Sequence, residues 1–233
     1  YGALSTDTLG QYSVAIGRSA LTAQNFTTAT STYNTAVGYL AGTEVTTGIL
    51  NTLIGGVSGD ALTTGTRNVA VGQGSLGLDT KGSKSVAIGQ AALGTQNFTT
   101  ATDTFNTAVG NAAGVAVTTG IKNTIIGAIA GDALTDADEN TALGYFALGN
   151  DTLGGRNTAI GTGALATQNF TTSTNAYNVA VGYDAGAALT TGTSNTIIGG
   201  LAGDALTTGS DNTFIGRSTG GTGVVTGDNN TAC

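Results

Sequence analysis

Residues 34–72 read NTAVGYLAGTEVTTGILNTLIGGVSGDALTTGTRNVAVG and contain one short word three times. The word is Asn, Thr or Val, Ala or Leu, Val or Ile, and then Gly, and its glycines recur at a constant interval, at positions 38, 55 and 72. A fixed short period of this kind is the sequence signature of a repeat architecture. Variants of the word, with Asn or Ser at the start, end at these glycines: Gly17, Gly38, Gly55, Gly72, Gly89, Gly110, Gly127, Gly144, Gly161, Gly182, Gly199 and Gly216.

The marker glycines define one long unit followed by three short ones, and this order then recurs as a 72-residue super-repeat. The enlarged unit of each super-repeat contains the phrase QNFTT, at residues 24–28, 96–100 and 168–172. We therefore describe residues 1–233 as a single repeat domain with a partial unit, 1–17, and three super-repeats, 18–89, 90–161 and 162–233. Because both ends are in register with the pattern, we expect a segment of a longer fibre.

The columns of the repeat predict a short β-strand in every unit. Two positions that flank one residue, such as Thr35 and Val37, are β-branched or aliphatic throughout the repeats, so they point to one face of a strand. Thr, Val, Asn and Gly at this density are poor helix formers. We expect Asn to begin the strand from a turn and Gly to end it at a corner.

Stacking of these units predicts the fold class. A unit as short as Gly38 to Gly55 cannot bury an apolar face alone, whereas stacked units share one continuous core. The sequence therefore predicts an all-β fold, a parallel β-solenoid (β-roll) of about thirteen 17–21-residue coils. The residue between the two flanking ones is also apolar, usually Ala but sometimes Leu53 or Ile125. Apolar residues on both faces indicate that one face packs inside the coil and another copy of the chain covers the other.

The composition argues against several classes of protein. Gly is 39 of 233 residues, but 39% hydrophobic residues are too many for a disordered chain. The net charge is −7, and the four Arg and three Lys look scattered, so we expect no binding to nucleic acid and no anionic membrane partner. No apolar run approaches the ~20 residues that span a bilayer, so membrane insertion is not expected. Cys233 is the only cysteine, which leaves no internal disulfide.

We expect no enzyme, no cofactor and no metal site. The V/I-G-x-x-A spacing can be confused with hexapeptide-repeat acyltransferases, but their general base is typically His, and this chain has none. Asp60, Asp132 and Asp204 recur in GDALT words, yet calcium needs six to eight oxygen ligands, so we interpret them as turn residues. The many Thr residues raise the question of ice binding, but Thr alternates with Val beside Asn, which indicates a buried column.

The enlarged units contain the candidate recognition residues, because extra residues in a solenoid usually bulge on one face that is often the binding face. Each unit carries two aromatic residues that can stack on a sugar or hold a partner. The pairs are Phe26 and Tyr33, Phe98 and Phe105, and Phe170 and Tyr177. The alternative is that the rings pack over the edge of their own coil or seal a gap between chains. Asn25, Asn97 and Asn169 each begin Asn-Phe-Thr, which matches a glycosylation sequon.

Two stretches carry a resemblance to known fibres. YSVAIGRSAL (12–21) and KSVAIGQAAL (84–93) resemble the head repeats of trimeric autotransporter adhesins. The shorter form, NTAVG…AG…TTG…NTIIG, is similar to repeats in the shafts of phage and virus tail fibres. The resemblance covers essentially the whole chain, and it implies a parallel β-solenoid, a homotrimer and a stiff extracellular stalk or adhesive head. The periodic enlarged coils depart from the family pattern.

These observations together predict a structural protein. We expect a shaft or head segment of an extracellular adhesive fibre, on a virion tail or a cell-surface appendage, that gives rigid reach and attachment. Two other functions stay open. One is a self-assembling extracellular filament whose subunits stack end to end, and the other is a module that binds a host glycan or receptor through the enlarged coils. The expected partner in the first two cases is the chain itself.

Overall fold

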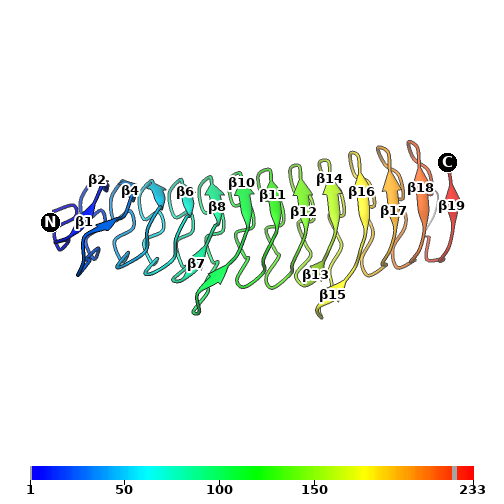
Figure 1. The fold of residues 1–233 in the computed structure, drawn as a ribbon. Coiled ribbons are helices and arrows are strands. Elements are labelled where there is room, and N and C mark those ends of the chain that lie inside the picture. The colour runs from blue at the N-terminus through cyan, green and yellow to red at the C-terminus, as the bar shows by residue number, and fades with distance from the viewer. Residues whose placement is uncertain (1, 222–224) are drawn as a thin grey trace. The chain divides into compact units, whose positions relative to one another are not determined.

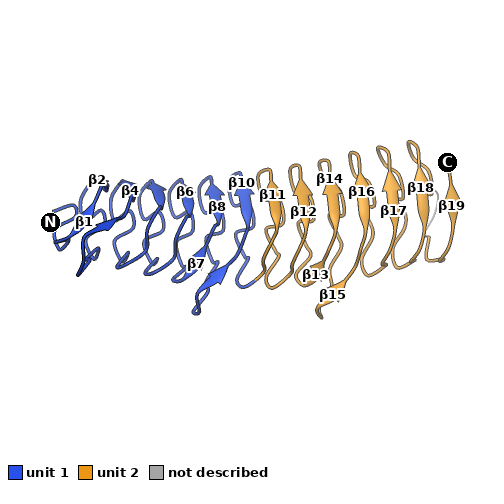
Figure 2. Cartoon of the chain, viewed as in Figure 1, with its two compact units in different colours: residues 1–119 blue, residues 120–233 orange. Residues whose placement is uncertain are grey.

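The computed structural model describes residues 2–221 and 225–233, and these residues form an all-β fold without a helix. Tyr1 and residues 222–224, which belong to the first and last segments of the predicted repeat domain, lie outside the described residues. The chain forms two compact units, Tyr1–Thr119 and Gly120–Cys233 (Figure 2). Each unit is a stack of coils with one principal strand per coil, and the described strands amount to about thirteen turns (Figure 1). The predicted parallel β-solenoid is confirmed.

The principal strands are short and pair in parallel with their neighbours inside each unit. Thr35, Thr52 and Val69 stand side by side in three successive coils, so identical columns of the repeat form ladders. In unit 1 the principal strands are β2 (Val14–Ile16), β4 (Thr35–Val37), β5 (Thr52–Ile54), β6 (Val69–Val71), β8 (Val86–Ile88) and β10 (Thr107–Val109). In unit 2 they are β11 (Thr124–Ile126), β12 (Thr141–Leu143), β14 (Thr158–Ile160), β16 (Val179–Val181), β17 (Thr196–Ile198), β18 (Thr213–Ile215) and β19 (Thr231–Ala232).

The middle residue of a principal strand points into the coil and is buried. Ala70 in β6 leaves space that a fully buried Leu76 occupies from the following segment. Leu53 in β5 is larger, and the equivalent of Leu76 in that coil is Gly59, where a Cβ would lie 2.8 Å from a Leu53 methyl group. In these two coils a large residue at one position therefore accompanies a small residue at the other, and the interior stays filled at close packing.

The two flanking residues of each strand point outward, because side chains alternate across a strand. The column that begins with Val14 and Thr35 is half-buried or exposed in the single chain. The prediction that this Thr and Val column is buried is therefore wrong for the chain by itself. The interior accepts only the middle residue of each principal strand, which is Ala36 in one coil, Leu53 in the next and Phe214 in β18, so the flanking pair faces outward.

The marker glycine at the end of each strand is required for two reasons. Gly72 has a φ of +132°, a backbone conformation that side chains other than hydrogen rarely permit. A Cβ at Gly72 would also lie 2.4 Å from the carbonyl oxygen of Gly89 in the next coil. The predicted corner is confirmed, and the close stacking of one glycine on the next explains why no larger residue occurs there.

The Asn that precedes each strand belongs to a buried hydrogen-bonded ladder. Asn51 Nδ2 donates to the carbonyl oxygen of Gly65 at 2.9 Å, and Asn51 Oδ1 accepts from the backbone N–H of Asn68 at 3.0 Å. The Asn51 side chain therefore satisfies two buried backbone groups of the next coil, one acceptor and one donor. This is why Asn recurs at the position where the sequence predicts a turn.

Each enlarged coil adds a two-residue strand that pairs in parallel with the preceding coil. These pairs are β1 (Gly10–Gln11) with β3 (Thr30–Ser31), β7 (Gly82–Ser83) with β9 (Thr102–Asp103), and β13 (Gly154–Gly155) with β15 (Thr174–Asn175). The exposed residues 171–173 precede β15 and form a loop that projects from unit 2 (Figure 1). The predicted bulge of the enlarged units is therefore present.

Candidate functional site

The outward columns of the principal strands give each unit an apolar face. The first column consists of Thr and Val, and the second consists of Val, Ile and Leu, of which six are exposed, namely Ile16, Ile54, Ile88, Leu143, Ile198 and Ile215. The exposed fractions reach 59% for Ile16 in unit 1 and 43% for Ile215 in unit 2. A contiguous exposed aliphatic face usually marks an interaction site. Both faces of the strand carry apolar residues, as predicted, with Ala most often on the inner face and Val or Ile on the outer face.

The first aromatic residue of each enlarged coil packs on its own chain. Phe26, Phe98 and Phe170 are each only 7% exposed. Phe170 lies against the preceding coil, because a Cβ on Gly154 would come within 2.8 Å of the Phe170 ring. The rings therefore help to seal the edge of their own coil, and their contact with a ligand stays a prediction.

A buried carboxylate and a buried carboxamide join each enlarged coil to the coil before it. In the central super-repeat, Gln96 Nε2 donates to Asp79 Oδ2 at 2.6 Å and to Ser85 Oγ at 2.9 Å. Gln96 Oε1 accepts from Asn106 Nδ2 at 2.8 Å, which closes the enlarged segment between residues 96 and 106. Asp79 Oδ1 accepts from the backbone N–H of Gly82 at 2.9 Å. Asp79 and Gln96 have no exposed surface, and their polar atoms are satisfied by one another, by the Ser85 and Asn106 side chains and by the backbone.

The same pair recurs at the start of every super-repeat, where the Gln contacts an Asp of the preceding coil, although Asp7 is only half-buried. Gln168 Nε2 donates to Asp151 Oδ2 at 2.6 Å, and Gln24 Nε2 donates to Asp7 Oδ2. The other coils fill the same interior column, seven positions after the marker glycine, with the buried apolar residues Val45, Leu62, Val117, Leu134, Leu189 and Leu206. The sequence analysis missed this pair. Its signal is the word DTLG or DTKG, which stands one coil before each QNFTT, at residues 7–10, 79–82 and 151–154.

The Asn residues of the three sequons are exposed. Asn25, Asn97 and Asn169 each accept a hydrogen bond at Oδ1 from a Thr hydroxyl of the preceding coil. The distances from the Thr oxygen are 3.1, 3.2 and 3.1 Å. All three side chains are at the surface, where an attached sugar would need them, and their glycosylation stays a prediction.

The second aromatic residue of each enlarged coil lies at an exposed corner, directly before the ladder Asn. Tyr33, Phe105 and Tyr177 are 54, 51 and 51% exposed. The equivalent residue of every coil has a positive φ, and we call this set the corner column. Its members are Tyr12, Tyr33, Leu50, Arg67, Lys84 and Phe105 in unit 1, and Lys122, Glu139, Arg156, Tyr177, Ser194, Asp211 and Asn229 in unit 2.

The corner column contains four of the seven cationic residues of the chain, Arg67, Lys84, Lys122 and Arg156. The sequence analysis treated the cations as scattered, and the structure corrects this within each unit, because equivalent positions of stacked coils form a column that contains Arg67 and Lys84 in unit 1 and Lys122 and Arg156 in unit 2. The signal was present in the sequence as the residue that immediately precedes each Asn or Ser of the repeated word.

Aromatic and cationic side chains of the corner column contact each other. The rings of Tyr12 and Tyr33 are stacked, with centroids 5.2 Å apart. Lys84 Nζ lies 5.0 Å from the centroid of the Phe105 ring, and in unit 2 the Arg156 guanidinium lies 5.6 Å from the centroid of Tyr177. These are cation–π distances, and both pairs are at the surface.

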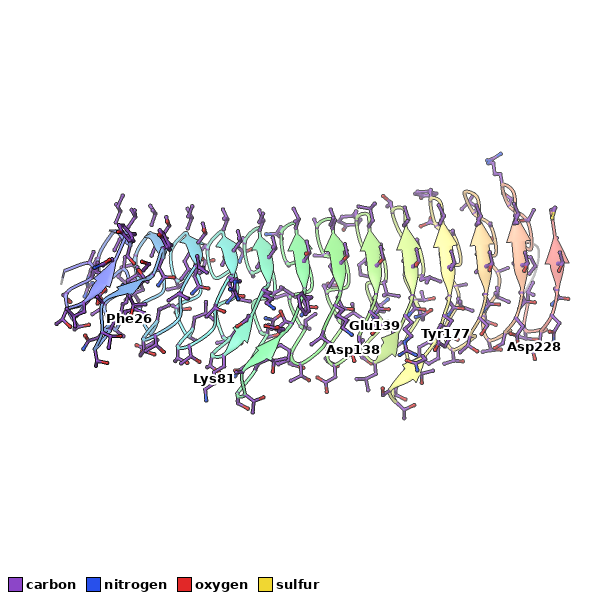
Figure 3. The ribbon with its side chains drawn as sticks, in the orientation of Figure 1. Phe26, Lys81, Asp138, Glu139, Tyr177 and Asp228 are labelled. Carbon is purple, nitrogen blue, oxygen red and sulfur yellow. The ribbon has the colours of Figure 1, made fainter. Side chains whose placement is uncertain are left out.

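Acidic residues neutralise part of the positive charge of the corner column. Glu139 accepts from Arg156 Nε at 3.0 Å and from Lys122 Nζ at 3.2 Å, and the hydrogen bond from Arg156 is the larger cause that lowers the pKa of Glu139. The pKa of Arg156 is raised, mainly by its hydrogen bond to the Tyr177 hydroxyl. Glu139 and Tyr177 lie on the same side of unit 2 (Figure 3). In unit 1 the partner of Lys84 is Asp103, at 2.6 Å.

The aspartates of the GDALT words are Asp60 in unit 1 and Asp132 and Asp204 in unit 2. In the part of the chain that the structure describes, no group of three or more His, Cys, Asp or Glu residues could hold a metal ion. Burial raises the pKa of the Asp60 carboxyl and of the Asp132 carboxyl above the usual value. Oδ1 of Asp132 and Oδ1 of Asp204 are buried without a hydrogen-bond partner. Burial therefore disfavours the ionised form of the Asp60 and Asp132 carboxyls.

Residues 2–221 and 225–233 enclose no pocket for a small molecule. Across these same ranges there is no long apolar helix of the kind that crosses a bilayer. Comparison of the chain with family models, with curated proteins and with solved structures gave no match. The function is therefore inferred from the surfaces of the solenoid.

Proposed function

We propose that the chain is a shaft or head segment of an extracellular adhesive fibre, on a virion tail or a cell-surface appendage, in which three copies pack through their outward apolar faces. The observation that carries this proposal is the exposed aliphatic column of the principal strands, which includes Ile16, Ile54 and Ile88. Covering apolar surface stabilises an assembly by about 25 cal/mol per Å². The number of copies rests on the resemblance to trimeric fibres.

The chemistry of the outward face favours a second copy of this chain over a polar ligand. Along β5 and β6 the outward residues are Thr52, Ile54, Val69 and Val71, which offer only Thr hydroxyl groups as polar side-chain atoms. β-branched side chains in register form a regular surface that a copy with the same period can match. Because identical columns recur in every coil, contacts made in one coil repeat in the next.

The internal bonding of each unit suits a stiff element. Every coil is bonded to its neighbours by parallel strand pairs, and the Asn ladder adds side-chain hydrogen bonds between coils, such as Asn51 to Asn68. Only 9% of the residues are charged, so repulsion between stacked coils is small. Each coil contacts mainly its neighbours, which is the arrangement that lets a solenoid transmit force along its stack.

Sedimentation equilibrium of the full chain, with a thiol reductant to keep Cys233 reduced, tests the proposal. We expect the mass of a trimer. The double variant Ile54→Lys, Ile88→Lys places charges in the outward face and should give monomers that retain β circular dichroism. The matched control is Leu78→Lys, because Leu78 is 54% exposed but lies outside the principal strands. A monomeric wild type, or a double variant that assembles normally, would contradict the proposal.

A further inference from the structure

The corner column keeps large side chains in a backbone conformation that favours small ones. Tyr33, Lys84, Phe105, Arg156 and Tyr177 have φ values between +50° and +64°. Gly, Asn and Asp tolerate this left-handed region best, since other side chains crowd the backbone there. The last three members of the column in unit 2, Ser194, Asp211 and Asn229, follow that preference and are small and polar.

Packing inside the chain does not account for the large residues at this corner. Leu21 and Leu76 also have positive φ values, but they are fully buried and fill the core. Tyr33, Phe105 and Tyr177 leave about half of their surface exposed. Residues held in sparsely populated backbone conformations cluster at active sites, ligand clamps and switch regions.

The side chains of the corner column combine flat rings with positive charge. In unit 1, Phe105 has Lys84 over its ring, and Arg67 is the next residue of the column beyond Lys84. In unit 2, Tyr177 has Arg156 over its ring, and Lys122 lies two coils before Arg156. This concentration of cationic side chains in the corner column is unusual in a chain whose net charge is −7. The column is therefore the place where an acidic chain offers an anion a favourable contact.

We propose that the corner column of each unit binds an extended acidic polysaccharide. In unit 1, sugar rings stack on Tyr33 and Phe105 and carboxylates of the polymer lie beside Arg67 and Lys84. In unit 2, a sugar ring stacks on Tyr177 and a carboxylate lies beside Arg156. A polymer fits because the described residues enclose no pocket and the contacts follow one another from coil to coil. A coil rises about 4.8 Å, so aromatic groups four coils apart within one unit, such as Tyr33 and Phe105, are separated by roughly 19 Å.

The low density of charge in the column selects an acidic polysaccharide over a nucleic acid. A nucleic acid strand carries one phosphate per about 3.4 Å, and its binding relies on many phosphate contacts. In unit 2 two cations share one carboxylate, that of Glu139, and in unit 1 Lys84 is paired with Asp103. Cations that are already partly neutralised in this way suit a polymer whose acidic groups are sparse and whose sugar rings provide much of the contact. Exposed ion pairs are weak, so a polymer carboxylate can replace Glu139 or Asp103.

This inference concerns a surface separate from the proposed contact between copies. The corner column precedes the principal strands, whereas the outward apolar face lies on the strands themselves. A monomeric chain that binds the polysaccharide would overturn the proposed assembly and leave the inference standing. A trimer that does not bind the polysaccharide would overturn this inference and leave the proposed assembly standing.

Binding of the full chain to immobilised alginate and to immobilised hyaluronan tests the inference, with neutral dextran and oligothymidylate as comparison probes. We expect wild type to bind at least one acidic polysaccharide, more weakly at high salt, and to bind dextran and oligothymidylate much less. The triple variant Tyr33→Ala, Phe105→Ala, Tyr177→Ala should lower the affinity about tenfold or more. Glu139→Gln and Asp103→Asn should raise it, because each removes a competing carboxylate.

The matched control is Tyr39→Ala, Tyr145→Ala, Tyr183→Ala, which removes three equally exposed tyrosines that follow marker glycines. This control should bind like wild type. The inference is overturned if wild type binds neither acidic polysaccharide, if dextran or oligothymidylate binds as well, or if the corner variant keeps its affinity. A corner variant that changes the sedimentation mass would also overturn it, since the column would then be a contact between copies.

Discussion

Replacing Asp79 with Asn alters the buried network by exchanging one acceptor for a donor. Asp79 Oδ1 accepts from the backbone N–H groups of Gly82 and Phe98, and an Asn oxygen can keep both bonds. The new Nδ2 group would then face Gln96 Nε2, which lies 2.6 Å from Asp79 Oδ2. Gln96 cannot turn over without loss, because its Oε1 accepts from Asn106 Nδ2 at 2.8 Å. The substitution therefore places two donors against each other in a site without exposed surface.

The expected loss of stability follows from the bonds affected. A hydrogen bond to a charged group contributes about 1.5–3 kcal/mol, and a buried unsatisfied donor costs about 1–3 kcal/mol. Gln96 Nε2 retains its bond to Ser85 Oγ, so we expect Asp79→Asn to lower the free energy of unfolding by about 2–4 kcal/mol. Unfolding in denaturant, monitored by circular dichroism, measures this change in the free energy of unfolding. The control is Asp103→Asn, which affects one exposed ion pair with Lys84 and should change stability by less than about 1 kcal/mol.

A second substitution distinguishes this explanation from a general loss of packing. The double variant Asp79→Asn, Gln96→Glu exchanges the carboxylate and the amide, so that the amide at 79 donates to the carboxylate at 96. That carboxylate can still accept from Asn106, and the Ser85 hydroxyl can rotate to donate to it. We expect the double variant to be about 1–2 kcal/mol more stable than the sum of the single effects. A neutral Asp79→Asn variant, or a double variant without this coupling, would refute the reasoning.

Three further changes have defined outcomes. Gly72→Ala should destabilise the chain by about 2–5 kcal/mol, because of the φ of +132° at Gly72 and the 2.4 Å approach of a Cβ to the carbonyl oxygen of Gly89. Gly56→Ala, where a Cβ has open space, should be nearly neutral in the same unfolding assay. Leu50→Asn should raise the unfolding free energy by about 0.5–1 kcal/mol, because Asn tolerates the φ of +62° better, and a loss would show that the Leu side chain has a packing role. Asp132→Asn should stabilise the chain at neutral pH, because burial raises the pKa of the Asp132 carboxyl in the folded state. The stability that comes from the protonated carboxyl is fully present below the unfolded pKa and is lost as the pH rises through the folded pKa. Unfolding measured at pH 7 and below pH 3.8 should show this gain only at pH 7, and an equal gain at both would contradict the burial explanation.

The fold was predictable because each column of the repeat has a narrow chemistry. Gly after each principal strand from β2 to β18, Asn or Ser before it and a β-branched or aliphatic pair within it leave few alternatives to a parallel solenoid. The side of the strand that faces inward could not be predicted, because Ala36 and its neighbours Thr35 and Val37 are all compatible with burial. Only the width of the coil decides the matter, and the fully buried Ala36 shows that a small residue fits.

The surfaces were less accessible to sequence reasoning, for reasons that differ between residues. Phe98 and Phe105 look equivalent in the sequence, yet the first packs inward on its coil and the second stands on a left-handed corner. Backbone conformation separates them, and no aromatic preference signals a positive φ. The pairing of Asp79 with Gln96 and the column that contains Arg67 required comparison at the period of the repeat, which the sequence allowed but which only stacking makes meaningful.

The buried pair and the exposed aromatic residue of an enlarged coil are parts of one arrangement. Gln96 holds Asn106 across the base of the enlarged segment, and Ser85 Oγ is 2.6 Å from Thr104 Oγ1. Thr104 and Asn106 are fully buried, so Phe105 between them has a fixed backbone and its ring must point away from the coil. An enlargement without this clamp would leave the corner free to move. The super-repeat therefore combines a buried polar clamp with the exposed ring that it positions, which explains why QNFTT recurs with DTLG or DTKG one coil earlier.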